Sequence, residues 1–195
     1  MEKIKLGHIG TRHDHSRAKL EGAKKFPDLF EIVGIVPESP EVAEKIKNDK
    51  VYGDVPVMTE EELFHVPGLD AVLCEGYELD SVAAAQRCID HGVHVHLDKP
   101  GGEDIAAYEH MLRDAKRKNL IVQLGYMYRY NPKYLEILDM VEKGELGTIY
   151  SVEAHMDCEH GAPKRAWLGK LDGGMMQFLG CHLVDLIFRL QGVPE

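Results

Sequence analysis

Apolar positions along the first part of the chain follow two alternating patterns, short continuous runs and longer segments with helical spacing. The short runs have the length of buried strands and cover residues 3–10, 31–36, 69–77, 93–100 and 120–128. Helical spacing lies between them, in residues 16–26, 39–48, 59–64, 78–92 and 103–119. Strands that alternate with helices of this length predict an α/β fold, a doubly wound parallel sheet of Rossmann type with helices on both faces.

Local signals for helix ends agree with this pattern. Ser39 is a typical N-cap, followed by Pro40 at the first helical position. Thr59 and Glu62 have the spacing of a capping box, and Gly92 is expected to stop its helix. Ligands of doubly wound sheets bind beyond the carboxyl ends of the strands, so residues at those ends are the first candidates for a site.

The pattern changes after residues 129–132. The later segments are a helix closed by Gly147 at residues 133–147, an alternating strand at 148–157, a loop at 158–174 and a helix at 174–192. We therefore expect a dinucleotide-binding domain at residues 1–122 and the beginning of an α+β domain at residues 123–195. A lone strand is not independently stable, so this second domain should be incomplete or covered by something else, such as a second copy.

Charge and composition narrow the class of protein. A formal net charge of −10 makes nucleic acids and anionic membrane surfaces unfavourable partners. No window approaches the roughly 18 consecutive apolar residues of a membrane span, and the N-terminus lacks the pattern of an export signal. The four cysteines, at positions 74, 88, 158 and 181, have no framework spacing. We expect free thiols and a cytoplasmic protein.

The turn after the first strand is a degraded dinucleotide-binding fingerprint. With Gly10 as the first glycine of G-x-G-x-x-G, Arg12 and His15 stand where the other two glycines belong. The turn is therefore either an ordinary strand-to-helix connection or a phosphate site in which Arg12 and His13 replace backbone donors. A metal site made of His13, Asp14 and His15 is disfavoured, because neighbouring residues on a turn rarely converge on one ion.

Glu38 follows the second strand. An acid there can accept hydrogen bonds from an adenosine ribose and would favour NAD over NADP. Arg12 nearby obscures that preference, and the alternative is a solvent-exposed glutamate before a helix.

Lys99 is the most informative single residue. It ends a strand between Asp98 and Pro100, and the proline fixes the backbone and allows a cis peptide bond. Both features would direct the ammonium inward, where it can hold a substrate hydroxyl or stabilise an oxyanion. The alternative is a surface lysine in a loop.

His182 lies on the last helix, on one face with Phe178 and Asp185. It is either a general acid–base tuned by these neighbours or a core histidine bonded to Asp185.

A zinc site made of Cys158, His160, Cys181 and His182 matches no common spacing, so we expect no metal.

Four segments together resemble the Gfo/Idh/MocA family of NAD(P)-dependent oxidoreductases. They are LGHIGTRHDHS at 6–16, VHVHLDKPGGED at 93–104, LGYMYRYNP at 124–132 and GGMMQFLGCHLVDL at 173–186. The resemblance implies a nucleotide-binding domain followed by an α+β domain. It also implies hydride exchange between a nicotinamide, NAD or NADP, and a hydroxyl carbon of a sugar, cyclitol or similar polyol. A homo-oligomer formed through the second domain is the expected assembly.

The resemblance also implies residue roles. Lys99 matches the active-site lysine, Asp98 the acid near the nicotinamide ribose, and His182 the histidine that relays the hydroxyl proton. The expected cofactor-binding residues are Gly10, Thr11, Arg12, His13, Glu38, Glu75, Gly76, Asp98, Lys99 and Pro100. The expected substrate-side residues are Lys99, Tyr128, Arg129, Phe178 and His182.

Three features depart from the family pattern. Phe178 stands where the family usually has an aspartate one turn before the histidine, two glycines of the fingerprint are missing, and family members continue beyond Glu195. Two alternatives therefore stay open. One is a nucleotide- or sugar-binding regulatory protein without the chemistry, and the other is a lyase or hydrolase that uses transient oxidation.

Overall fold

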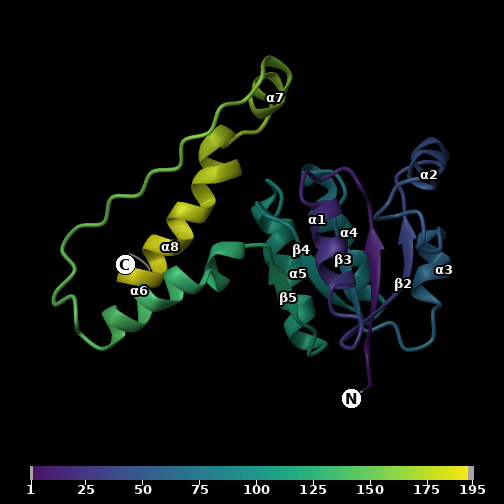
Figure 1. Ribbon diagram of the computed structural model, residues 1–195, viewed down its shortest axis with the longest axis horizontal. Helices are drawn as coiled ribbons and strands as arrows, with labels where there is room; N and C mark the ends of the chain where they lie inside the picture. Colours follow the sequence, from purple (N-terminus) through teal and green to yellow (C-terminus); the bar gives the residue numbers. More distant parts are fainter. Residues whose placement is uncertain (1, 193–195) are drawn as a thin grey trace. The chain divides into compact units, whose positions relative to one another are not determined.

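The computed structural model describes residues 2–192 and divides into two compact units, one on each side of the Gly125–Tyr126 bond. Each unit is described by itself (Figure 1).

The first unit is built on a five-stranded sheet whose strands all run parallel, as the sequence predicts. The strands are β1 (Ile4–Ile9), β2 (Phe30–Val36), β3 (Ala71–Cys74), β4 (His94–Leu97) and β5 (Val122–Leu124). Their order is β2-β1-β3-β4-β5, and every neighbouring pair is parallel. The chain leaves β1 in one direction to reach β2, and β3 lies on the other side of β1. The topological switch point, where such sheets bind ligands, is therefore between β1 and β3.

Helices cover both faces of this sheet (Figure 1). They are α1 (Ser16–Lys24), α2 (Pro40–Ile46), α3 (Glu60–Phe64), η1 (Glu78–Asp80), α4 (Ser81–Asp90) and α5 (Ile105–Arg117). One core lies under α4 and α5 and includes Val72, Val95 and Leu97. The other is centred on Leu20 and Ile35. Among the described residues, no helix is long and apolar enough to span a membrane.

The helix ends confirm the predicted capping residues. Ser39 accepts a hydrogen bond from the Val42 amide, with Pro40 in the first turn of α2. Thr59 and Glu62 form the complete capping box of α3. Gly92 follows α4 with a φ of +78°, in the left-handed region that favours glycine.

A groove of about 880 Å³ lies along α1 and the neighbouring face of the sheet. Apolar side chains such as Leu6, Phe26 and Ile121 line it. Most of its lining comes from the amino ends of the strands and does not include the residues that follow their carboxyl ends, so it is not the candidate site.

The second unit is helical in the described residues, and two sequence predictions are wrong there. Its elements are η2 (Met127–Tyr130), α6 (Pro132–Glu142), α7 (Ala162–Leu168), the π-helical turn η3 (Met176–Gly180) and α8 (Cys181–Gln191). Residues 148–157 form no strand, because the described part of this unit contains no other strand to pair with. Residues 158–174 are not all loop, because α7 packs Leu168 against Leu171 and Phe178.

A buried polar chain fastens the end of β1 to α1. His8 is completely buried, and its Nε2 lies 2.9 Å from the Ser16 hydroxyl, which lies 2.9 Å from the Tyr52 hydroxyl. Burial lowers the pKa of His8 from 6.5 to about 3. At a pH between the two pKa values, His8 is protonated in the unfolded chain and neutral in the folded chain. Stability from this group is therefore complete above pH 6.5 and falls as the pH drops toward 3.

Replacing His8 by Gln should flatten the acid side of the stability profile. The wild-type chain should lose about 3 kcal/mol of unfolding free energy between pH 6.5 and 4 through this group, at about 1.4 kcal/mol per pKa unit. The His8→Gln chain should lack that loss, although it will be less stable at pH 7. Urea unfolding at a series of pH values measures both. His110→Gln, at an exposed position on α5, is the control and should keep the wild-type slope. If the unfolding free energy of wild type and His8→Gln depended on pH with the same slope, His8 would not have a lowered pKa in the folded chain.

Candidate active site

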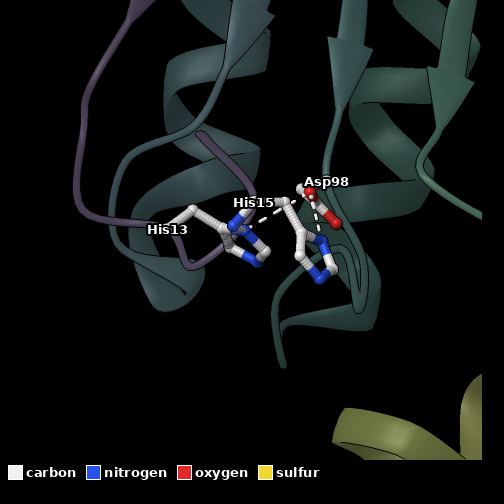
Figure 2. A group of neighbouring side chains, drawn as sticks. All are labelled: His13, His15 and Asp98. Atoms are coloured by element: carbon white, nitrogen blue, oxygen red, sulfur yellow. Dashed lines mark hydrogen bonds and ion pairs between the residues drawn. The ribbon is translucent and has the colours of Figure 1, made fainter. Parts of the chain in front are cut away.

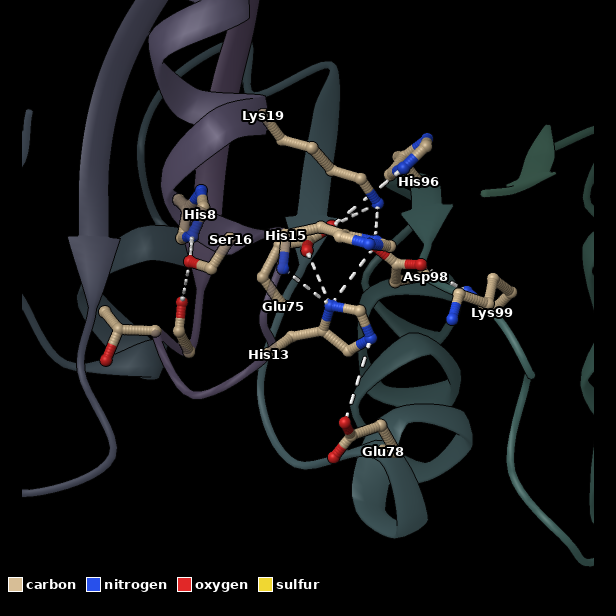
Figure 3. A network of polar contacts seen from close by, with 12 residues as sticks. His8, His13, His15, Ser16, Lys19, Glu75, Glu78, His96, Asp98 and Lys99 are labelled. Atoms are coloured by element: carbon tan, nitrogen blue, oxygen red, sulfur yellow. Dashed lines mark hydrogen bonds and ion pairs between the residues drawn. The ribbon is translucent and has the colours of Figure 1, made fainter. Parts of the chain in front are cut away.

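A cluster of ionisable side chains fills the carboxyl ends of β1, β3 and β4 (Figure 3). Its members are His13 and His15 after β1, Lys19 on α1, Glu75 and Glu78 after β3, and Asp98 and Lys99 after β4. The cluster lies at the switch point, because the backbone amide of His13 donates to the Glu75 carbonyl at 3.0 Å. Gly10 permits this close approach: its φ is +83°, and a Cβ there would lie 2.4 Å from the Gly76 Cα.

Asp98 is the centre of the cluster. Its Oδ1 accepts from the Lys99 amide at 2.6 Å, and its Oδ2 lies 3.0 Å from His15 Nδ1 and accepts from the Lys19 ammonium. The carboxylate is 2% exposed. Burial alone would raise the pKa of Asp98, but His15, Lys19 and His13 together hold it well below its usual range. Asp98 is therefore a buried anion at neutral pH.

The pKa of Glu75 shifts in the opposite direction from that of Asp98. It is completely buried, and Lys19 donates to its Oε1 at 2.8 Å. Burial, aided by the charge on Asp98, raises the pKa of Glu75 to about 8 against the opposing pull of Lys19. Two neighbouring carboxyl groups with separated pKa values are a common arrangement in active sites.

His13 is also buried, and burial is the main cause that lowers its pKa to about 4. Its Nδ1 accepts from the His15 amide at 3.1 Å and lies 3.3 Å from Asp98 Oδ2. Its Nε2 faces Glu78 Oε1 at 4.0 Å. His13 is therefore a neutral imidazole surrounded by acids.

Lys99 is 1% exposed, which is rare for a lysine. The Lys99–Pro100 peptide bond is cis, the option that the sequence left open. The alternative of a surface lysine in a loop is wrong.

The predicted ribose-binding acid makes contact with the glycine turn. Glu38 accepts from the Thr11 amide at 2.6 Å and from the Thr11 hydroxyl at 2.8 Å. Arg12 is exposed, and its guanidinium lies 4.4 Å from the centre of the Tyr77 ring. Thr11 and Glu38 thus come together, while Arg12 stacks on the loop that follows β3.

The second unit brings several substrate-side candidates together around α8. His182 is 3% exposed, and the rings of Tyr126 and Tyr128 lie edge-on to it at 5.9 and 4.9 Å. Asp185, expected as a neighbour of His182, is held by the Arg129 guanidinium through two nitrogens at 2.5 to 3.0 Å. The ion pair joins η2 to α8, so it fixes the segment that carries Tyr128.

Phe178 is used for packing. It is 5% exposed, and its ring lies 5.3 Å from that of Trp167 in a small apolar cluster. Its role toward a substrate stays a prediction.

Lys99 lies in the first unit and His182 in the second, so the structure describes each within its own unit.

Sequence reasoning missed Lys19, Glu78 and His96 as neighbours of this cluster. Lys19 has a readable signal, because it follows His15 by four residues and so shares its helix face. Of the four residues weighed as zinc ligands, Cys158 and His160 lie close together on an exposed segment, with Cys158 Sγ 3.0 Å from His160 Nε2.

Two family models match the chain. One describes an oxidoreductase family with an NAD-binding Rossmann fold and matches residues 4–126. The other describes the Gfo/Idh/MocA C-terminal domain and matches residues 134–195.

Among curated relatives, myo-inositol 2-dehydrogenase of Thermotoga maritima is 24% identical over 97% of this chain and 54% of its own length. The NADP-dependent scyllo-inositol 2-dehydrogenase of Bacillus subtilis is 25% identical over 78% of this chain and 43% of its own length. The chain thus spans about half the length of these relatives.

Among solved structures, scyllo-inositol dehydrogenase of Lactobacillus casei, with bound NAD(H) and scyllo-inositol, superimposes with a TM-score of 0.78 at 21% identity. The match covers 98% of this chain and 57% of that one, and at this identity it supports the fold alone. Since the Rossmann model covers more than half of the sequence and the second model continues from it, the chain belongs to the Gfo/Idh/MocA oxidoreductase family.

Proposed function

We propose that the protein is an NAD(P)-dependent oxidoreductase that exchanges hydride between a nicotinamide and a hydroxyl carbon of a cyclitol, sugar or similar polyol. Family membership supports the reaction class, and the two inositol dehydrogenases among the relatives support the substrate class. The observation that carries the proposal is the burial of Lys99 beside Asp98 at the end of β4.

The first unit fits a dinucleotide. A Cβ built on Gly76 meets no atom within 4 Å, so open space lies above the switch point. The N-terminal turn of α1 contains no acidic residue, which leaves the positive end of the helix dipole available to a phosphate. We expect Gly10, Thr11, Arg12, His13 and Gly76 to contact the pyrophosphate side. Glu38, Glu75, Asp98, Lys99 and Pro100 would hold the sugars and the nicotinamide.

A bound nicotinamide would accept or supply the hydride, and the chain's own residues would handle the proton and the charge. We assign His182 to take the hydroxyl proton, and Lys99 to stabilise negative charge that develops on the oxygen. Asp98 keeps the Lys99 backbone in place through the 2.6 Å hydrogen bond. Arg129, anchored by Asp185, would hold Tyr128 on the substrate side. A homo-oligomer formed through the second unit and a cytoplasmic location stay predictions.

Lys99→Met should lower kcat/KM for an inositol with NAD by about 100-fold or more, the usual effect of losing one charge-stabilising donor. Methionine retains most of the buried volume, so the near-UV circular dichroism spectrum should change little. Lys118→Met, at a half-exposed lysine, is the matched control and should keep wild-type turnover. Unchanged turnover in Lys99→Met would remove the assignment, and NADH binding without turnover in the wild-type chain would favour the regulatory alternative.

His182→Ala should reduce kcat by about 100-fold or more, the range for loss of a general acid–base. It should also remove one limb of the pH–rate profile. Asp14→Ala, at an exposed position, should change neither quantity. If the two variants lose activity equally, or if His182→Ala keeps the pH profile, His182 is a packing residue only.

The wild-type chain should bind NADH at least about tenfold more tightly than NADPH. The reason is that Thr11 fixes the Glu38 carboxylate where a 2′-phosphate would meet a like charge. Glu38→Gln should reduce this ratio toward one, while Glu44→Gln on α2 should not change it. Fluorescence titration with both reduced nicotinamides measures the ratio, and a wild-type preference for NADPH would contradict the prediction.

A further inference from the structure

His13, His15 and Asp98 bring three metal-ligand atoms to one point at the switch point (Figure 2). One donor atom from each residue lies within 4.8 Å of the other two. His13 and His15 come from the turn after β1, and Asp98 follows β4, so the group joins two strand ends. We propose that these side chains bind a divalent transition-metal ion, with Zn²⁺ the best match to two imidazoles and a carboxylate.

The spacing of the donor atoms suits a tetrahedral ion. Zinc–nitrogen and zinc–oxygen bonds of about 2.0–2.2 Å place neighbouring ligand atoms about 3.3–3.6 Å apart in a tetrahedron. Asp98 Oδ2 lies 3.3 Å from His13 Nδ1 and 3.0 Å from His15 Nδ1. Two of the three donor pairs therefore already have nearly this spacing, and the third pair, the two imidazoles, lies within 4.8 Å.

Hydrogen bonding alone does not account for His13. Its Nδ1 accepts from the His15 amide at 3.1 Å, which requires a lone pair on that nitrogen. The same nitrogen faces Asp98 Oδ2 at 3.3 Å, and two acceptors at that distance repel each other. A proton on Nδ1 would satisfy the contact with Asp98 but would lose the one with the amide. A metal ion between imidazole and carboxylate also removes the repulsion, and like a proton it takes the lone pair of Nδ1 in place of the amide contact.

Glu75 supplies a second, independent indication. It is completely buried, and its Oε2 has no hydrogen-bond partner among the described residues, although the Glu75 carboxyl group as a whole is hydrogen-bonded to Asp98. That oxygen lies 3.8 Å from His13 Nδ1, on the same side as Asp98 (Figure 3). A buried polar oxygen without a partner is costly, and coordination would release the proton that Glu75 holds at neutral pH. Coordination as the fourth ligand would satisfy it.

Lys19 and the Lys99 amide would act as outer partners of the site. Both donate to Asp98, and ligating carboxylates in metal sites are usually hydrogen-bonded in this way. The arrangement differs from the one weighed on sequence grounds, because the third ligand is Asp98, far along the chain, and Asp14 is exposed.

The test uses the full 195-residue chain and Co²⁺ as a spectroscopic probe. We expect one equivalent of Co²⁺ to give the visible absorption of a four-coordinate ion, without the near-ultraviolet band of a cobalt–thiolate bond. Zn²⁺ should displace it. His15→Gln should weaken Zn²⁺ binding by about 100-fold or more, because loss of a residue that merely orients a ligand already costs 10–100-fold. His15 is about one-third exposed, so this variant should fold, and circular dichroism checks it.

Two controls make the outcome decisive. His110→Gln removes an exposed histidine on α5 and should leave Zn²⁺ affinity unchanged. Cys158→Ser removes the exposed thiol beside His160 and should also leave it unchanged. No Zn²⁺ binding by the wild-type chain, wild-type affinity in His15→Gln, or loss of binding in Cys158→Ser would each overturn the proposal. The metal ligands His13, Glu75 and Asp98 are also expected to contact the cofactor, but the measurement needs no nicotinamide, so a failure of metal binding is distinguishable from a failure of the oxidoreductase assignment.

Discussion

The first unit depends on one buried anion, the Asp98 carboxylate. It contacts the turn after β1 through His15, α1 through Lys19 and its own strand end through the Lys99 amide. An unpaired carboxylate at this depth would cost several kcal/mol, so each of these partners is held firmly in place. The contacts that stabilise the carboxyl ends of the strands therefore also fix His15, Lys19 and Lys99, the residues on which any chemistry there would rely.

Glu75 and Asp98 show how position in the cluster decides protonation. Both are buried carboxyl groups, and both contact the Lys19 ammonium. Asp98 has further partners in His15 and the Lys99 amide and stays charged, whereas burial dominates at Glu75 and raises its pKa to about 8. One ammonium cannot compensate two buried anions, so one of the two carboxyl groups gives up its charge at neutral pH unless a further cation is present.

The sequence predicted most of the first unit because its strands, caps and stop signals are local. Ser39, Thr59 and Gly92 act within a few residues of their own position, and the structure agrees with each. The second unit was harder to predict from the sequence. A segment such as 148–157 alternates like a strand, but a strand needs a neighbouring strand to pair with, and the described residues of this unit do not provide one. Lys99 was readable from its place at a strand end. Its neighbour Glu78 was not, because it lies on a different element and the two side chains meet only after folding. Lys19 had only an indirect signal, its spacing of four residues from His15.

The loss of two glycines from the turn after β1 and the presence of His13 and His15 there are two aspects of the same change. A glycine-rich turn leaves room for a ligand to approach bare backbone, whereas this turn keeps only Gly10, where the approach of Gly76 allows no side chain. Arg12 and His15 occupy the other two glycine positions, and His15, together with His13, turns toward Asp98. The turn has thus exchanged backbone amides for imidazoles at the place where the family's fold presents its ligands. Whatever binds there must be recognised by side-chain nitrogen and carboxylate oxygen as much as by peptide N–H groups.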